Sequence, residues 1–405
     1  MANPRVRASF AGVTAITHNP VERLVATCAR GLEGVLRGEL EGLGHSDVRE
    51  GRGMVEFGGG FADVLRANLW LRSAMRVLAR LADGPAGSRE ELYRLALSVP
   101  WEELIGRGQT FAVEVAGRGD AFAHSTFPAL VVKDAIADRL RSRRGERPDV
   151  DRERPDVLIH AHLSGARAGL SLDGTGEPLS HRGWRPRGGP APLAESLAAG
   201  VLLLAGYDGS QPFLDPMCGT GTLAIEAALI ATGSAPGLGR SFACERWAAA
   251  SATDVRELRA EARRRRRPAP AAIVGSDADD RAVAAGARNA QEAGVGAEVR
   301  FEKRDVRELE PPGAGAVIVA NPPYGHRLGR DSDLGGLYAA IGDALKRRAA
   351  GCSAWILVGD PDLAKRIGLR PKRRVVLFNG PIECRLLGFD LVHGRLPSRS
   401  GTETA

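Results

Sequence analysis

The sequence predicts an α/β protein whose carboxyl-terminal half is a doubly wound, mostly parallel sheet with an edge hairpin, preceded by two small α+β units. Three observations predict this fold. From residue 193 onward, apolar strand patterns and helical patterns alternate regularly. The last two strand patterns flank the turn sequence Asn379-Gly380-Pro381, which is typical of a hairpin. Before residue 174 the elements follow an α+β order, and a stretch rich in glycine and proline separates them from the second half.

Composition is that of a soluble globular protein and excludes several classes. The chain has 405 residues, enough for two or three domains, with 43% hydrophobic and 26% charged residues. No apolar run approaches the roughly 18 residues of a membrane span, and the amino terminus lacks the pattern of a secretory signal. The 5 cysteines form no CxxC pair, which argues against zinc and disulfides. We therefore expect a cytoplasmic monomer with neither a membrane nor a metal as partner.

The first half is expected to hold two units after a flexible tail at residues 1–19. The first unit, residues 20–80, alternates strand and helix patterns in the order typical of a ferredoxin-like α+β unit. Its elements are expected at residues 23–27, 32–40, 54–57, 62–71 and 77–79. The second unit, residues 81–175, is expected to hold helices at 90–97, 101–104 and 127–140, a strand at 111–115, an exposed loop at 141–154, and a hairpin at 156–160 and 166–173.

Residues 176–190 are a linker by composition. They contain Arg182, Trp184, Arg185 and Arg187 close together, with no acid among residues 180–187. Guanidinium groups neutralise phosphates and an indole stacks on bases, so this patch is predicted to bind RNA. A solvated linker is the alternative. The net charge of +7 permits nucleic-acid binding without establishing it.

Residues 191–392 carry the regular βα pattern, and residues 393–405 are expected to be a disordered tail. Strands are predicted to end near residues 215, 277, 305 and 320, with a fifth at 355–358 and a closing antiparallel pair at 375–378 and 384–389. Helices are predicted at residues 193–204, 223–230 and 280–294.

The first strand of this half runs into a glycine-rich turn, residues 215–222 (Asp-Pro-Met-Cys-Gly-Thr-Gly-Thr). Gly219 and Gly221 would let the backbone approach a ligand closely. The turn is not a phosphate loop, because no Gly-Lys-Ser/Thr is present, and it is not the dinucleotide fingerprint. Asp277 and Asp305 follow the next two strands. A carboxylate there can accept hydrogen bonds from a nucleoside cofactor, although helix capping is the alternative for each.

A second motif, Asn321-Pro322-Pro323-Tyr324, ends the fourth strand. Its prolines cannot continue a central strand, so the motif is predicted at the carboxyl end, where open α/β sheets place ligands. The amide offers an acceptor and the phenol ring offers a stacking face. Together they suit a planar substrate with an amino group, such as a nucleobase. A turn with a packed tyrosine is the alternative.

These motifs resemble those of class I S-adenosylmethionine-dependent amino-methyltransferases. The first half is similar to the ferredoxin-like plus THUMP module of RNA-modifying enzymes, and residues 180–198 and 377–382 resemble the bacterial THUMP-containing guanine-2-amino methyltransferases of 23S rRNA, the RlmL type. The resemblance covers residues 20–392. One departure is that the large bacterial relatives carry a second methyltransferase domain, which this sequence does not include.

The resemblance implies a cofactor, S-adenosylmethionine, and a role for each motif. Asp277 would hold the ribose, and Asp305 the adenine with Val306 packed nearby. Tyr324 would stack on a guanine flipped out of its stack, while the Asn321 oxygen and the Pro322 carbonyl accept from its exocyclic amine. The remaining residues would line the methionine end of the cofactor: Asp215, Cys218, Gly219 and Gly221.

The implied partner is RNA, with 23S rRNA expected and tRNA as the near alternative. Two more distant alternatives are a methyltransferase acting on a protein glutamine and a ribosome assembly factor without catalysis. Adenine is a further target for Asn-Pro-Pro-Tyr enzymes. The arginine runs at residues 263–267 and 370–374 could touch RNA phosphates or be solvated.

Overall fold

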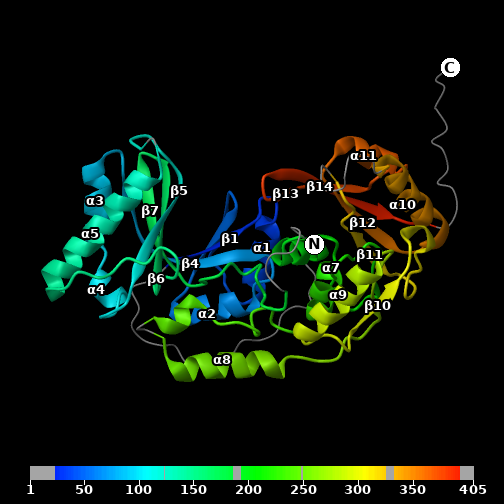
Figure 1. Cartoon of the computed structure of the whole chain (residues 1–405), viewed down its shortest axis with the longest axis horizontal. Coiled ribbons are helices and arrows are strands. Elements are labelled where there is room, and N and C mark those ends of the chain that lie inside the picture. Colours follow the sequence, from blue (N-terminus) through cyan, green and yellow to red (C-terminus); the bar gives the residue numbers. More distant parts are fainter. Residues whose placement is uncertain (1–22, 123, 186–192, 248–249, 325–332, 393–405) are drawn as a thin grey trace, which may run out of the picture. The chain divides into compact units, whose positions relative to one another are not determined.

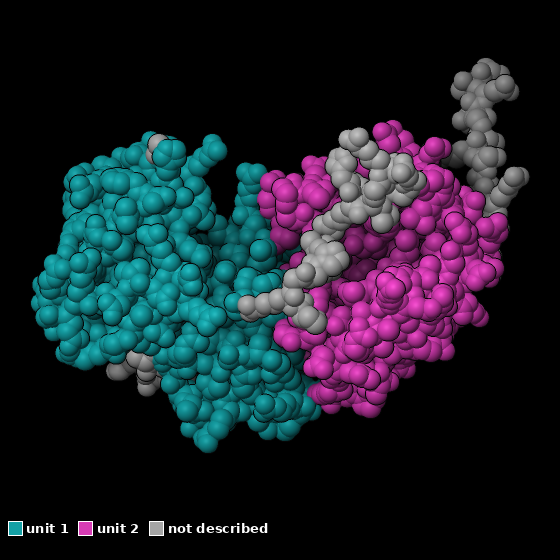
Figure 2. All heavy atoms as spheres, viewed as in Figure 1, with its two compact units in different colours: residues 1–28, 32–182, 235–265 teal, residues 29–31, 183–234, 266–405 magenta. Residues whose placement is uncertain are grey.

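The computed structural model describes residues 23–122, 124–185, 193–247, 250–324 and 333–392. Its contacts divide the chain into two compact units, coloured teal and magenta in Figure 2. Unit 1 is built mainly from residues 32–182 and 235–265. Unit 2 is built mainly from residues 183–234 and 266–405. The predicted tails, and Arg187 in the linker, lie outside the described residues.

Unit 1 contains the elements predicted for both α+β units, and Figure 1 labels them. Its strands are β1 (Arg23–Cys28), β2 (Val48–Gly51), β3 (Met54–Gly58), β4 (Ala74–Pro85), β5 (Phe111–Gly119), β6 (Val157–Gly165) and β7 (Arg167–Asp173). Its helices are α1 (Glu33–Gly42), α2 (Phe61–Trp70), α3 (Arg89–Ser98), α4 (Trp101–Leu104), α5 (Thr126–Arg144) and α8 (Ala252–Arg264), with the short turn η2 (Ala243–Arg246).

A single sheet runs through unit 1, because β4 is longer than the sequence predicts. Within the described residues the strand order is β2-β3-β1-β4-β7-β6-β5. The first part of β4 pairs with β1, Leu24 lying opposite Ala79, and the rest pairs with β7 as far as Pro85 opposite Arg167. The expected boundary at residue 80 therefore falls inside a continuous strand. The predicted hairpin is present as the antiparallel pair β6 and β7.

Residues 235–265 cluster with unit 1, although the sequence analysis places them in the carboxyl-terminal half. The amide of the buried Asn68 on α2 explains part of this. Its Nδ2 donates to the carbonyls of Val64 at 2.9 Å and Gly174 at 3.2 Å and contacts the thiol of Cys244. Farther along, the guanidinium of Arg265 lies 5.1 Å from the ring centroid of Trp70 on α2. Sequence periodicity does not reveal such long-range partners.

Unit 2 has the predicted doubly wound architecture. Its strands are β8 (Phe213–Asp215), β9 (Ile273–Asp277), β10 (Val299–Lys303), β11 (Val317–Ala320), β12 (Ser353–Val358), β13 (Arg373–Asn379) and β14 (Ile382–Asp390). Its helices are α6 (Glu195–Leu204), α7 (Thr222–Ala231), α9 (Asp280–Glu292), α10 (Leu334–Arg348) and α11 (Pro361–Arg366), with the turn η3 (Val306–Glu308). Helices α10 and α11 are absent from the sequence analysis.

The strand order of this second sheet, among the described residues, is β10-β9-β8-β11-β12-β14-β13. The strands from β10 to β12 are parallel, and β14 and β13 add an antiparallel edge. The chain moves outward from β8 on one side toward β10 and on the other through β11 toward β12. This change of direction is a topological switch point, where open α/β sheets bind ligands. The turns after β8 and β11 are therefore neighbours.

Helices cover both faces of the sheet (Figure 1). Helices α7 and α9 pack against the β8 to β10 side, whereas α10 contacts α11 and η3. The core under α10 is fully apolar apart from one phenol: Tyr338, Ile341 and Leu345 pack with Ile318 of β11 and Ile356 of β12. Because Ile318 is buried here, the residues that follow β11 are held at a fixed edge of the sheet.

Candidate functional site

The turn after β8 is held by the end of β9. Asp277 Oδ2 accepts a hydrogen bond from the Gly219 amide at 2.9 Å, and Cys218 N–H donates to the Ser276 carbonyl at 2.9 Å. From the other side, Asn289 Nδ2 of α9 donates to the Thr220 carbonyl at 2.9 Å. The turn is thus preorganised by contacts with two neighbouring elements. Asp277 Oδ1 also accepts from the Asp279 amide at 3.0 Å.

Gly221 is the N-cap residue of α7 and has a positive φ of 89°, which favours glycine. A Cβ at this position would lie 2.8 Å from Cζ of Phe301 on β10. The same ring fills the space beside two other glycines: an added Cβ would lie 2.8 Å from it at Gly275 and 2.7 Å at Gly286. These glycines let β9, α9 and the turn approach one aromatic ring closely. The glycine-rich pattern of the turn predicts a role for Gly221, whereas no motif in the sequence points to Phe301.

Asp215 is buried, with 1% of its surface exposed, at the end of β8. Its Oδ1 accepts from the Met217 amide at 3.2 Å. Burial raises the pKa of this carboxyl to about 8, and the negative charge of Asp277 acts in the same direction. Burial also raises the pKa of the neighbouring Cys218 thiol, which therefore stays protonated and packs rather than acting as a nucleophile.

In the ligand-free protein, the stability of Asp215→Asn relative to the wild type is expected to be higher at pH 8 than at pH 5. In the unfolded chain a carboxyl loses its proton near pH 4, whereas folded Asp215 keeps it to about pH 8, so wild-type stability falls as pH rises through this window. Asparagine cannot ionise, so the variant's melting temperature should gain on the wild type between pH 5 and pH 8. The exposed Asp343→Asn is the control. An equal difference at both pH values would contradict the prediction.

The structure brings the three predicted carboxylates to one edge of the sheet. β8, β9 and β10 are adjacent and parallel, and Asp277 lies opposite Lys303 at the end of β10. Asp305 follows, with Oδ1 accepting from the Arg307 amide at 2.8 Å and Oδ2 lying 3.3 Å from the Arg307 guanidinium. Val306 beside it is buried. Asp305 thus also caps η3, which was the alternative for this residue.

Asn321 follows β11 directly, next to the turn after β8. Its Oδ1 is buried and has no hydrogen-bond partner among the described residues. An unpaired buried acceptor is costly in a folded protein, and such groups are typical of sites that a ligand completes. Pro322 is buried, and the Pro323 carbonyl accepts from Tyr338 Oη of α10 at 3.3 Å. Tyr324 is also buried, at 6% exposure.

Three of the residues predicted to bind RNA, Arg182, Trp184 and Arg185, are largely buried in the part of the linker that the structure describes. Arg182 is 3% exposed and donates to the carbonyls of Leu179 at 2.8 Å and Arg72 at 2.6 Å. Trp184 is also buried, with the guanidinium of Arg185 lying 5.1 Å from its ring centroid. Arg185 donates to Glu195 at 2.7 Å. Composition shows Arg182 and Arg185 as cations, but in the folded chain their guanidinium groups donate to acceptors of the protein itself.

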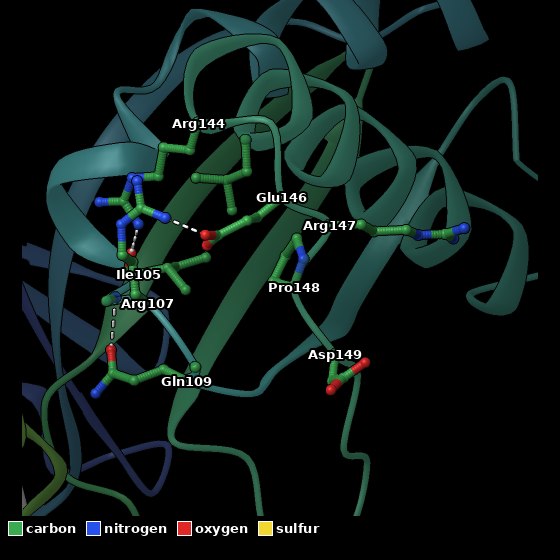
Figure 3. Close-up of a pocket in the computed structure, with 11 residues that line it drawn as sticks. Ile105, Arg107, Gln109, Arg144, Glu146, Arg147, Pro148 and Asp149 are labelled. Atoms are coloured by element: carbon green, nitrogen blue, oxygen red, sulfur yellow. Dashed lines mark hydrogen bonds and ion pairs between the residues drawn. The ribbon is translucent and has the colours of Figure 1, made fainter.

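A separate hollow of about 240 Å³ lies in unit 1, between α5 and the segment before β5. Figure 3 shows that several of its charged side chains are paired with groups of the protein: Arg107 with Glu146, and Arg144 Nη1 with the Ile105 carbonyl at 2.7 Å. It carries none of the residues of the motifs, so the candidate active site is the switch point of unit 2.

Among the described residues, no helix is long and apolar enough to cross a membrane. No group of three or more His, Cys, Asp or Glu side chains in that part of the chain could hold a metal ion.

Comparison with known families matches three consecutive segments. Residues 182–387 match an RMKL-like methyltransferase domain, residues 86–173 match a THUMP domain, and residues 23–78 match an RlmL ferredoxin-like domain. The three matched segments cover both units and include both motifs of the candidate site.

Individual relatives agree with these matches. The chain is 41% identical over 385 residues to "Ribosomal RNA large subunit methyltransferase K/L" of Syntrophotalea carbinolica, covering 92% of this chain and 54% of that protein. It therefore spans about half the length of this relative. It is 39% identical to "Putative RNA methyltransferase slr0064" of Synechocystis, covering 90% of this chain and 96% of that protein. Among solved structures, SMU.472 complexed with SAH is 30% identical, with a TM-score of 0.84 over 93% of this chain and all of that one.

Proposed function

This chain belongs to the family that joins an RMKL-like methyltransferase domain to THUMP and RlmL ferredoxin-like domains, and we propose that it methylates the exocyclic 2-amino group of a guanine in RNA. The substrate that we propose is 23S rRNA. The family membership supports methyl transfer, and the names of the relatives, which refer to ribosomal RNA of the large subunit, support the choice of RNA.

The observation that carries this proposal is the unpaired, buried Oδ1 of Asn321. The lone pair of an exocyclic amine is delocalised into the base ring, so the nitrogen is a weak nucleophile. An amide oxygen and a backbone carbonyl that accept its two N–H groups favour a pyramidal nitrogen, whose lone pair is then free to attack. In the proposal, Asn321 Oδ1 and the Pro322 carbonyl are these acceptors. Preorganised acceptors and alignment, rather than a strong base, lower the barrier.

The residues of the neighbouring turns fit S-adenosylmethionine, which supplies an electrophilic methyl group when bound. In the proposal, Asp277 holds the ribose hydroxyls through acceptor capacity left beside its two backbone contacts, and Asp305 with Val306 holds the adenine. The methionine end lies along the turn after β8, lined by Asp215, Cys218, Gly219 and Gly221. A neighbour solved with SAH supports this assignment.

A guanine must leave its base stack before an enzyme can reach its amine. In the proposal, the ring of Tyr324 stacks on the flipped base beside Asn321. The THUMP match supports RNA over a protein glutamine as substrate. No contact of the described residues distinguishes one RNA from another, so tRNA is the alternative substrate. We propose that the protein acts in the cytoplasm as a monomer.

The test incubates the full chain and methyl-labelled S-adenosylmethionine with 23S rRNA, 16S rRNA or tRNA from cells lacking the gene. Nucleoside mass spectrometry is expected to find N2-methylguanosine in 23S rRNA alone. Label in tRNA alone would keep the chemistry and replace the substrate, and label in adenosine would contradict the target base. If SAH bound but no RNA were labelled, a protein substrate or a non-catalytic ribosome factor would replace the proposal.

A further inference from the structure

The hydroxyl of Tyr324 is held by the edge hairpin of β13 and β14. Asn379 Nδ2, at the end of β13, donates to Tyr324 Oη at 2.9 Å. The thiol of Cys384 on β14 also points to this oxygen, with Sγ at 3.7 Å. Both residues lie more than fifty positions from Tyr324 in the sequence and belong to the same unit. The polar end of the ring is therefore fixed by elements outside the tetrapeptide.

The face of the ring is fixed by Gly359, which follows β12. A Cβ at Gly359 would lie 2.4 Å from Cδ2 and 2.7 Å from Cε2 of Tyr324, both far below a van der Waals contact. The ring therefore lies directly on the backbone, and no larger residue fits at this position without moving it. The glycine makes room for the ring in this position, and the hairpin donor holds its hydroxyl.

The backbone of the tetrapeptide is held independently. Tyr338 of α10 is fully buried and donates to the Pro323 carbonyl at 3.3 Å. Because α10 fixes the main chain, loss of the hairpin contact would leave the position of Asn321 unchanged and release only the ring of Tyr324. The donor turn is held by Asp277 and Asn289, neither of which touches the hairpin.

We propose that Asn379 is a positioning residue for methyl transfer, acting through the Tyr324 hydroxyl to hold the ring in one orientation beside Asn321. This inference rests on the proposed function, which assigns the ring to the target base. Asn379 contacts neither the methyl donor nor the reacting amine. Small displacements of a positioning group lower reaction rates strongly, because the bound base no longer adopts the reactive geometry.

The test compares Asn379→Ala, Tyr324→Phe and the double variant of the full chain. Asn379→Ala is expected to lower kcat about 10- to 100-fold while the affinity for SAH, measured by calorimetry, stays within about twofold. Tyr324→Phe should have an effect of similar size. The double variant should be no slower than the slower single variant, because both substitutions remove the same hydrogen bond.

Ile382→Ala is the matched control, because Ile382 lies opposite Asn379 in the hairpin and has an exposed apolar side chain that cannot donate a hydrogen bond. It is expected to keep the wild-type kcat. If Asn379→Ala does not fold, Asn379→Leu, which keeps the side-chain volume but carries no hydrogen-bond donor, takes its place. A wild-type kcat in the Asn379 variant, or effects that multiply in the double variant, would overturn the inference.

A readout independent of activity separates this inference from the proposed function. The chain has 4 tyrosines, so fluorotyrosine labelling gives few ¹⁹F resonances, and Tyr324→Phe identifies the one from Tyr324. Asn379→Ala is expected to shift or broaden that resonance alone. An unchanged Tyr324 resonance overturns the inference, whereas a wild-type protein that labels no RNA overturns only the proposed function.

Discussion

Asn321→Ala is expected to lower the rate of methyl transfer to RNA by about 10²- to 10³-fold, the usual cost of removing one preorganised hydrogen-bonding group from an active site. The affinity for SAH should stay within about twofold, because the donor turn lies after β8 and has its own supports. Single-turnover methyl transfer and calorimetry measure the two quantities separately.

The melting temperature of the same variant provides a second criterion. Oδ1 of Asn321 is buried without a partner among the described residues, so its removal should leave stability unchanged or raised. Gln291→Ala, an exposed amide on α9, is the control and should change neither rate nor affinity. Transfer at the wild-type rate by Asn321→Ala would falsify the role given to its oxygen. A large loss of stability would instead indicate a structural role.

Gly221→Ala is expected to abolish detectable SAH binding and to destabilise unit 2 by about 3 kcal/mol, through left-handed strain and overpacking. The added Cβ would lie 2.8 Å from Phe301 Cζ and 3.2 Å from the Gly286 Cα. The ring cannot move away, because Gly275 and Gly286 already lie against it. The turn must therefore shift, and with it the backbone that would line the methyl donor.

Gly206→Ala is the matched control for this substitution. Gly206 also has a positive φ, 76°, but nothing lies within 4 Å of an added Cβ. It should therefore lose about 1–2 kcal/mol from backbone strain alone and bind SAH normally. Calorimetry and thermal unfolding of both variants check the pair. Equal SAH affinity for Gly221→Ala and Gly206→Ala would show that close packing against Phe301 does not matter for the cofactor.

The sequence predicted the sheet of unit 2 well, because its strands are short apolar runs with a motif directly after each. Asp215, Asp277 and Asn321 lie at or directly after the ends of strands, as the apolar runs before them predict. Helix α10 was missed, because three glycines and several polar residues weaken its apolar pattern. Periodicity also gave no sign that β4 would extend to Pro85.

Long-range partners were beyond the reach of the sequence. The pattern showed Arg182 and Arg185 as cations, but not that a carbonyl of Arg72 and the carboxylate of Glu195 would take them. It showed Asn379 as a turn residue, but not its bond to the Tyr324 hydroxyl. Such contacts depend on how distant elements pack, which local propensity does not encode.

Strand β4 links the two parts of unit 1. Its first part pairs with β1 on one edge and its later part with β7 on the other, and the two pairings overlap at Leu78 and Ala79, so no gap in the backbone ladder separates the ferredoxin-like part from the THUMP part. A chain cut near residue 80 would leave an unpaired edge on each fragment, and such edges promote aggregation. We therefore expect the two matched segments to unfold cooperatively, which hydrogen exchange measured in both segments would check.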